Sequence, residues 1–250
     1  MSKFSKIAQA LRSARLTRAL ALHRVLAGSE HRFVLSTELA TVVDVGANRG
    51  QFSLAVRQWA PGARVIAFEP LPGPASIFRS VFAGEASVEL HQVALGIKPE
   101  RREMHVSGRD DSSSLLPISA TQTSLFPGTA EIGSVEVTTG PLGDFVEQGE
   151  LRAPAMLKLD VQGFEYDALL GCRTMLPFFQ WIYCECSFVE LYTGQKLAAE
   201  VVALLAENGF SLAGVHNPAY DSMGRCIQAD LLFSAAAGSQ SLATGKSSQQ

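Results

Sequence analysis

Residues 41–50, TVVDVGANRG, decide the fold of this chain. Thr41 to Val45 form a short run of β-branched and apolar residues, which predicts a buried strand. Gly46 and Gly50 mark the turn that follows, and apolar residues then recur at helical spacing over 52–59. A strand, a glycine turn and a helix in this order predict the beginning of an α/β fold.

The same order of strand, turn and helix recurs farther along the chain. Further strands are predicted at 64–68, 88–95, 155–161, 181–186, 210–215 and 227–233, and further helices at 77–82, 164–175 and 197–205. This alternation predicts right-handed βαβ units and a mostly parallel sheet with helices on both faces. The last two strands are joined by a loop too short for a parallel crossover, so we expect them to form an antiparallel pair at one edge.

Residues 96–154 interrupt this alternation. Short strands could form at 103–107 and 135–139, and residues 110–114 are polar and typical of a turn. A long excursion of this kind usually serves as a lid or a substrate loop. We therefore expect one domain over residues 38–234, with 96–154 as its lid or insert.

The composition is that of a globular protein. The chain has 250 residues, of which 47% are hydrophobic and 18% charged, enough to bury one sizeable core. A net charge of −3 argues against a nucleic-acid binder that relies on electrostatic attraction. No apolar run reaches the roughly 18 residues of a membrane span, and the four cysteines contain no C-x-x-C pair that would indicate zinc. We expect a soluble, cytoplasmic protein.

The two ends of the chain differ from its centre. Residues 1–29 contain six basic residues and no acidic one, and apolar residues follow helical spacing over 4–14. This pattern predicts a basic amphipathic helix over 1–30 that packs on the domain. Alternatively, residues 1–28 lie on the anionic inner face of a membrane, or they form an organellar transit peptide. Residues 235–250, rich in Ser, Ala, Gly and Gln, predict a disordered tail.

Acidic residues accompany the ends of the first two predicted strands. Glu69 can accept two hydrogen bonds from a ribose diol, and together with the glycine turn it indicates an adenosine-containing ligand. The dinucleotide fingerprint G-x-G-x-x-G is absent, and Asp44 instead lies two residues ahead of Gly46. A carboxylate there would repel a pyrophosphate but attract a cationic amino acid. The sequence therefore favours S-adenosylmethionine, with a nicotinamide-dependent oxidoreductase as the alternative.

At these residues the chain resembles the FkbM family of S-adenosylmethionine-dependent methyltransferases. The resemblance runs from about Thr41 to Phe233 and rests on DVGANRG at 44–50, FEP at 68–70, VAL at 93–95, DDSSSL at 110–115, LKLDVQGFEYDALLG at 157–171, ECS at 185–187 and ADLLF at 229–233. It implies a class I methyltransferase (Rossmann-like) fold and O-methylation, often of sugar hydroxyls. A carbohydrate, a glycosylated lipid or a natural product is then the expected acceptor.

The resemblance also implies roles for single residues. It implies that the methionine part of the cofactor is held by Asp44, Gly46, Asn48 and Gly50, its ribose by Glu69 with Pro70, and its adenine near Ala94. Asp160, at the end of the fourth predicted strand, would lie beside the transferring methyl group.

Two acids are candidates for the base that takes the proton of the acceptor hydroxyl. Asp160 is the first candidate, and Glu185, at the end of the fifth predicted strand, is the second. Alternatively, the pair could hold a divalent metal such as magnesium. Gln162 departs from the family, which commonly has Glu in its D-V-E-G block, so a non-catalytic cofactor-binding scaffold is a further alternative. For His216 we expect a surface or structural role.

Overall fold

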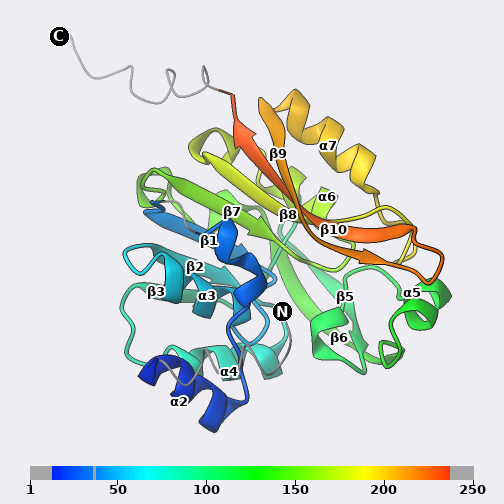
Figure 1. Cartoon of the computed structure of the whole chain (residues 1–250), viewed down its shortest axis with the longest axis horizontal. Coiled ribbons are helices and arrows are strands. Elements are labelled where there is room, and N and C mark those ends of the chain that lie inside the picture. Colours follow the sequence, from blue (N-terminus) through cyan, green and yellow to red (C-terminus); the bar gives the residue numbers. More distant parts are fainter. Residues whose placement is uncertain (1–12, 36–37, 237–250) are drawn as a thin grey trace.

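Seven strands form the central sheet of the computed structural model, which describes residues 13–35 and 38–236 (Figure 1). These strands are β1 (Thr41–Val45), β2 (Arg64–Phe68), β3 (Val88–His91), β7 (Ala155–Leu159), β8 (Trp181–Ser187), β9 (Phe210–Tyr220) and β10 (Cys226–Ala235). Their order across the sheet is β3-β2-β1-β7-β8-β10-β9. The first five strands in this order are parallel, whereas β10 pairs antiparallel with both β8 and β9. The predicted α/β class, with an antiparallel pair at one edge, is confirmed.

Helices cover both faces of this sheet. One face is covered by α2 (Ala14–His23), α3 (Gln51–Trp59) and α4 (Pro72–Val81), and the other by α6 (Glu165–Gly171) and α7 (Ala198–Glu207). Successive residues of a strand point to opposite faces. In β1, Val42 therefore packs with the α3 side, and Val43 and Val45 pack with the α6 side. Asp44 shares the face of Val42 and so points toward α3.

A second, smaller sheet forms where the sequence predicts an irregular insert. It consists of β4 (Ala94–Leu95), β5 (Glu100–Ser107) and β6 (Glu131–Gly140) in the order β4-β6-β5, and the helix α5 (Ala120–Leu125) lies between β5 and β6 in the chain. β5 and β6 pair antiparallel over most of their length. Met104 and Val137 of this sheet are buried in the same core cluster as α6. The insert is thus an ordered wall of the domain.

The prediction of a single strand over residues 88–95 is wrong, because the structure has two strands there, β3 and β4. β2 ends at Phe68, opposite His91, so the chain beyond His91 has no partner left in the central sheet. Two residues later Ala94 and Leu95 pair with β6 instead. One apolar run of sequence therefore serves two sheets.

The ends of the described chain differ in part from the prediction. α2 ends at His23, so the expected helix is shorter at its carboxyl end, and residues 1–12 lie outside the described part. Leu16 is buried and Arg15 pairs with Glu85 at 2.7 Å, so this helix packs on the domain. At the other end β10 extends to Ala235, and most of the predicted tail lies outside the described residues. None of the described helices is long and apolar enough to cross a membrane.

Candidate active site

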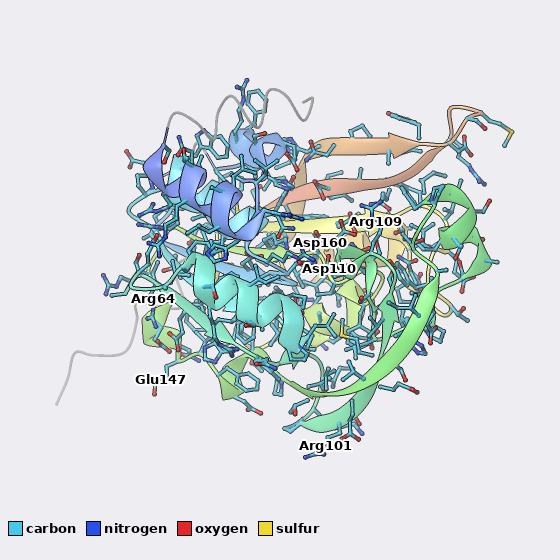
Figure 2. The ribbon with its side chains drawn as sticks, turned by 90° about the horizontal axis from the view of Figure 1, so that it is seen from below. Arg64, Arg101, Arg109, Asp110, Glu147 and Asp160 are labelled. Carbon is cyan, nitrogen blue, oxygen red and sulfur yellow. The ribbon has the colours of Figure 1, made fainter. Side chains whose placement is uncertain are left out.

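A cavity of about 340 Å³ opens at the carboxyl ends of β1, β2 and β7. The turns after these strands form one part of its wall, and the small sheet with the loop that follows β5 forms another. The predicted site residues that line it are Gly46, Asn48, Glu69, Pro70, Ala94 and Asp160, whereas Asp44, Gly50 and Glu185 are not part of the lining. Figure 2 shows Asp160 and the lining residue Asp110 toward the centre of the molecule, with Arg101 and Glu147 at its periphery.

The glycine turn after β1 packs directly on the turn after β7. Gly46 has a positive φ of 76°, and a Cβ placed on it would lie 1.8 Å from the carbonyl oxygen of Asp160. Only glycine fits a position with both features. Gly50 begins α3 at the other end of the turn, where a Cβ would lie 2.6 Å from the Phe82 ring. Gly50 therefore allows the helix to pack, and Gly46 and Asn48 form the cavity wall.

Glu69 places a buried carboxylate in the cavity. Its side chain accepts hydrogen bonds from the backbone N–H of Asn48 at 2.9 Å and of Leu71 at 2.8 Å. Burial raises the pKa of Glu69 to about 7, and the two backbone hydrogen bonds offset this only in part. Each carboxylate oxygen can accept a further hydrogen bond, so Glu69 can still bind a ligand hydroxyl.

Asp44 lies behind the cavity wall and already has a cationic partner. Its carboxylate is 0% exposed, pairs with the Lys158 ammonium at 3.1 Å and accepts a hydrogen bond of 2.6 Å from the Ser53 hydroxyl. Lys158 thus takes the place that the sequence-based interpretation gave to a cationic ligand. This arrangement does not favour direct contact between Asp44 and a ligand.

Lys158, which the sequence analysis did not single out, connects Asp44 to the cavity. It is the last residue but one of β7 and donates to the carbonyl oxygens of Val45 at 3.3 Å and Gly46 at 3.1 Å. Burial lowers its pKa, but the carboxylates of Asp44 and Asp160 outweigh this, so that the pKa is raised and the ammonium stays charged. A lone lysine within an apolar strand was the available signal, because a buried charge requires a partner.

Gln162 joins the two predicted bases. Its side-chain nitrogen donates to Asp160 at 2.6 Å and to Glu185 at 2.9 Å, and its side-chain oxygen accepts from the Tyr192 hydroxyl at 2.8 Å. The Asp160 side chain is 40% exposed and lines the cavity. Glu185 also accepts a hydrogen bond of 2.7 Å from Gln228. Burial, with the charges of Asp160 and Asp230 nearby, raises the pKa of Glu185 well above its usual value.

This arrangement does not fit the expected metal site. A neutral amide, with its N–H groups toward both acids, stands between Asp160 and Glu185. The space between Asp160 Oδ1 and Glu185 Oε2 therefore holds hydrogen-bond donors, whereas a metal ion needs oxygen lone pairs there. Within residues 13–35 and 38–236 no three His, Cys, Asp or Glu side chains gather in a way that could hold a metal ion.

The polar loop after β5 borders the cavity. Asp110, Asp111 and Ser113 line it. Arg49 of the glycine turn donates to Asp110 at 2.7 Å, and the Ser114 hydroxyl donates to the backbone oxygen of Gln162 at 2.6 Å. The loop is therefore attached to the turn after β1 and to the turn after β7.

The rest of the lining combines predicted residues, Asn48 and Ala94 among them, with residues that were not predicted. Asn48 and Gln51 belong to it, and their side-chain oxygens Oδ1 and Oε1 are buried without a hydrogen-bond partner in the described part of the chain. Another part of the cavity lining is apolar and consists of Val93, Ala94, Leu95, Met104 and Leu115. Glu30 and His31 reach the lining from η1, the 3-10 helix Ser29–Phe33. His216 is not in the lining, and its ring lies 6.0 Å from that of Tyr183.

Comparison with known proteins gives the same family as the sequence motifs. The Methyltransferase FkbM domain matches residues 44–212. The 2-O-methyltransferase NoeI of Sinorhizobium fredii is 27% identical over 195 residues, which cover 76% of this chain and 78% of the relative. The 31-O-demethyl-FK506 methyltransferase FkbM of Streptomyces tacrolimicus is 26% identical over 209 residues, which cover 72% of this chain and 75% of the relative.

A solved structure is also similar to this chain. Methyltransferase FkbM from Methylobacillus flagellatus has a TM-score of 0.49 and 15% sequence identity, over 78% of this chain. The match spans 44% of the length of that protein. The domain match extends from Asp44 at the first turn to Leu212 in β9, and so includes most of the residues that line the cavity. Because it covers more than half of the sequence, this chain belongs to the FkbM family of methyltransferases.

Proposed function

We propose that this protein is an S-adenosylmethionine-dependent O-methyltransferase whose acceptor is a hydroxyl of a carbohydrate, a glycosylated lipid or a related natural product. One observation carries the proposal. The cavity connects two carboxylates, that of Glu69, which is held by two backbone N–H groups, and that of Asp160, along the glycine turn after β1.

The lining suits each part of the cofactor. Glu69 can accept the hydrogen bonds of a ribose diol, and the apolar wall around Ala94 suits a flat adenine ring. The turn with Gly46 and Asn48, and Gln51 at the start of α3, border the rest of the cavity and leave room for the methionine part. When bound, S-adenosylmethionine supplies a methyl group that its sulfonium already makes electrophilic.

Three observations support a hydroxyl acceptor. The two relatives described above are named as methyltransferases that act at oxygen positions, 2-O and 31-O. The lining contains Asp110, Asp111 and Ser113, whose side chains suit the hydroxyl groups of a polyol. The net charge of −3 does not favour a polyanionic acceptor such as a nucleic acid.

Asp160 is the carboxylate that we place beside the reacting atoms. Gln162 holds one of its oxygens, and Lys158 lies 3.9 Å from the other. Fixed in this way, Asp160 can orient an acceptor hydroxyl and stabilise the positive charge that builds on its oxygen. Alignment of the two reacting atoms can itself contribute about 7–11 kcal/mol. Glu185 is outside the lining and acts, in this scheme, only through Gln162.

Titration calorimetry and a transfer assay test the proposal together. The protein should bind S-adenosylmethionine and not NAD, and it should transfer labelled methyl groups to members of a panel of glycans and glycolipids. Asp160→Asn should lower turnover by roughly 10²-fold or more and leave cofactor affinity within a few-fold. Asp167→Asn, at an acid of α6 outside the cavity lining, is the matched control for loss of a carboxylate. Binding of NAD instead, or near-normal turnover of Asp160→Asn, would contradict the proposal, and binding without any transfer would favour a non-catalytic scaffold.

A further inference from the structure

His31 lies in the cavity wall but outside the matched family domain. It belongs to η1, upstream of residues 44–212, and its side chain is 19% exposed. Its imidazole contacts the rings of Phe52 and Tyr183 edge-on, at centroid distances of 5.2 and 5.6 Å. A Cβ on Gly28 would lie 2.6 Å from the imidazole, so the chain leaves this space for His31. The N-terminal segment thus brings an ionisable group to the site.

The hydrogen bonds around Tyr183 determine which nitrogen of His31 carries the hydrogen. The Tyr183 hydroxyl donates its single hydrogen to Asp230 at 2.8 Å. It therefore accepts from Nδ1 of His31, which lies 3.0 Å away. Asn217 secures this arrangement by donating to Asp230 at 2.7 Å and to the Tyr183 hydroxyl at 3.2 Å. With the hydrogen on Nδ1, neutral His31 has its lone pair on Nε2.

Nε2 of His31 is available to a ligand. Among the described residues, none makes a hydrogen bond with this nitrogen, and the nearest charged group, Glu30 Oε1, lies 3.9 Å away. Burial lowers the pKa of His31 below 6.5, although Asp230 and Glu30 oppose this. Other titratable groups facing the ring are Lys158 and Asp160 at the end of β7, Tyr183 of β8 and, beyond Tyr183, His216 of β9. The imidazole is accordingly neutral at pH 7.

We propose that His31 is a catalytic residue, the general base that takes the proton of the acceptor hydroxyl through Nε2. This inference rests on the proposed function. As the acceptor oxygen bonds to the methyl carbon, the carbon–sulfur bond breaks and its electron pair stays on sulfur. The hydroxyl proton passes to Nε2 of His31, and the imidazolium then returns it to solvent. Tyr183 and Asp230 are positioning residues, because they hold the Nδ1–H form of the ring.

This assignment divides the chemistry between two groups. Asp160 already accepts a hydrogen bond from Gln162 and lies near the Lys158 ammonium. These two neighbours hold the Asp160 carboxylate in place, which suits a group that orients the acceptor. Burial lowers the pKa of His31, so its Nε2 keeps a free lone pair that can take a proton. Asp160 then orients the acceptor hydroxyl and stabilises the positive charge on its oxygen, and His31 removes its proton.

Nuclear magnetic resonance of histidine-labelled protein tests the ring without any acceptor. Long-range proton–nitrogen correlation should show His31 as the Nδ1–H tautomer, with a titration midpoint below 6.5. His31→Asn identifies its signal, and Tyr183→Phe should yield a mixture of tautomers. An Nε2–H tautomer in the wild-type protein would overturn the proposal.

Turnover against pH tests the catalytic role. His31→Asn keeps a donor for Tyr183 but removes Nε2, and it should lower kcat by roughly 10²–10⁴-fold with affinity for S-adenosylhomocysteine within a few-fold. At saturating cofactor and acceptor, wild-type kcat should fall as the pH drops through the His31 midpoint, and the variant should lose this limb. His105→Asn is the matched control, since His105 pairs with Glu131 away from the cavity. If His31→Asn has the same kcat as the wild type and the same decrease of kcat at low pH, His31 is not the base, and the proposed function is unaffected. If the wild-type protein itself transfers no methyl group, the proposed function is contradicted.

Discussion

The ends of β1 and β2 each hold a buried carboxylate, and the two are stabilised differently. Asp44 is 0% exposed and has a lysine and a hydroxyl as partners, and it does not line the cavity. Glu69 is 5% exposed, has two backbone N–H groups as partners, and lines the cavity. Asp44 lies within β1, one residue before its end, and Glu69 directly follows β2. Their partners, and not their burial, separate them.

This difference indicates which carboxylate serves the fold and which serves a ligand. A buried ion pair is already neutralised, so Asp44 has little to gain from a cationic ligand. Burial raises the pKa of Glu69 to about 7, and its two backbone N–H partners offset this only in part. A raised pKa of this kind in a cavity marks a functional group. We therefore expect changes around Asp44 to alter stability and changes at Glu69 to alter binding.

The largest expected effect is on stability. Lys158→Met leaves Asp44 buried without a cation, and we expect a loss of about 3–5 kcal/mol in the free energy of unfolding, measured by urea denaturation. The double variant Asp44→Leu with Lys158→Met removes both charges and should recover most of this loss. If the double variant is as unstable as the single one, the ion pair is not the cause.

A smaller effect is expected on binding when Glu69 loses its charge. Glu69→Gln should weaken the affinity for S-adenosylhomocysteine by about 10–100-fold, since a hydrogen bond to a charged group contributes about 1.5–3 kcal/mol. Titration calorimetry measures this loss. Glu89→Gln, at an acid of β3 that pairs with Arg64 outside the cavity, should bind normally. Equal affinities of the Glu69 variant and the wild type would remove the distinction between the two carboxylates.

Ser53 allows a finer test on the Asp44 side. Ser53→Ala removes the 2.6 Å hydrogen bond to Asp44 but keeps the ion pair with Lys158. We expect a loss of about 1–2 kcal/mol in the free energy of unfolding and an unchanged affinity for S-adenosylhomocysteine. A large change in affinity with little change in stability would mean that Asp44 serves the ligand after all.

The smallest effect is a dependence of binding on pH. Hydroxyl donors bind the ionised form of Glu69, whose pKa is about 7. The dissociation constant of S-adenosylhomocysteine should therefore change little between pH 9 and 8 and rise by about tenfold per pH unit below 7. Calorimetry on Glu69→Gln should show no such rise, and a wild-type profile that is equally flat would contradict the raised pKa.

Local patterns predict much of this fold and part of its site. The alternation of strands and helices, the turn at Gly46 and the acid Glu69 all depend on neighbours in sequence, which a pattern contains. The partner of Asp44 cannot be found from sequence neighbours. Lys158 is more than 100 residues away, and only the pairing of β1 with β7 brings the two residues together. The small sheet could not be predicted from the sequence for another reason. Most of its side chains on β5 and β6 are at least partly exposed, so no apolar run marks those strands.

His31 escaped prediction because its role depends on distant residues. Nothing in the sequence around it indicates a site, and its tautomer is determined by Tyr183 and Asp230, 152 and about 200 positions away. Gln162 is an intermediate case. It was noticed as a departure from a motif, but only the structure shows the amide between Asp160 and Glu185.

The contact between Gly46 and the Asp160 carbonyl has a kinetic consequence. Because a Cβ on Gly46 would lie 1.8 Å from the Asp160 backbone oxygen, we expect the two turns to move together. A methyl donor that binds the glycine turn should therefore also fix the position of Asp160, which contacts the acceptor. Donor and acceptor should then arrive in a compulsory sequence, methyl donor first, and initial-rate and product-inhibition patterns would reveal that order.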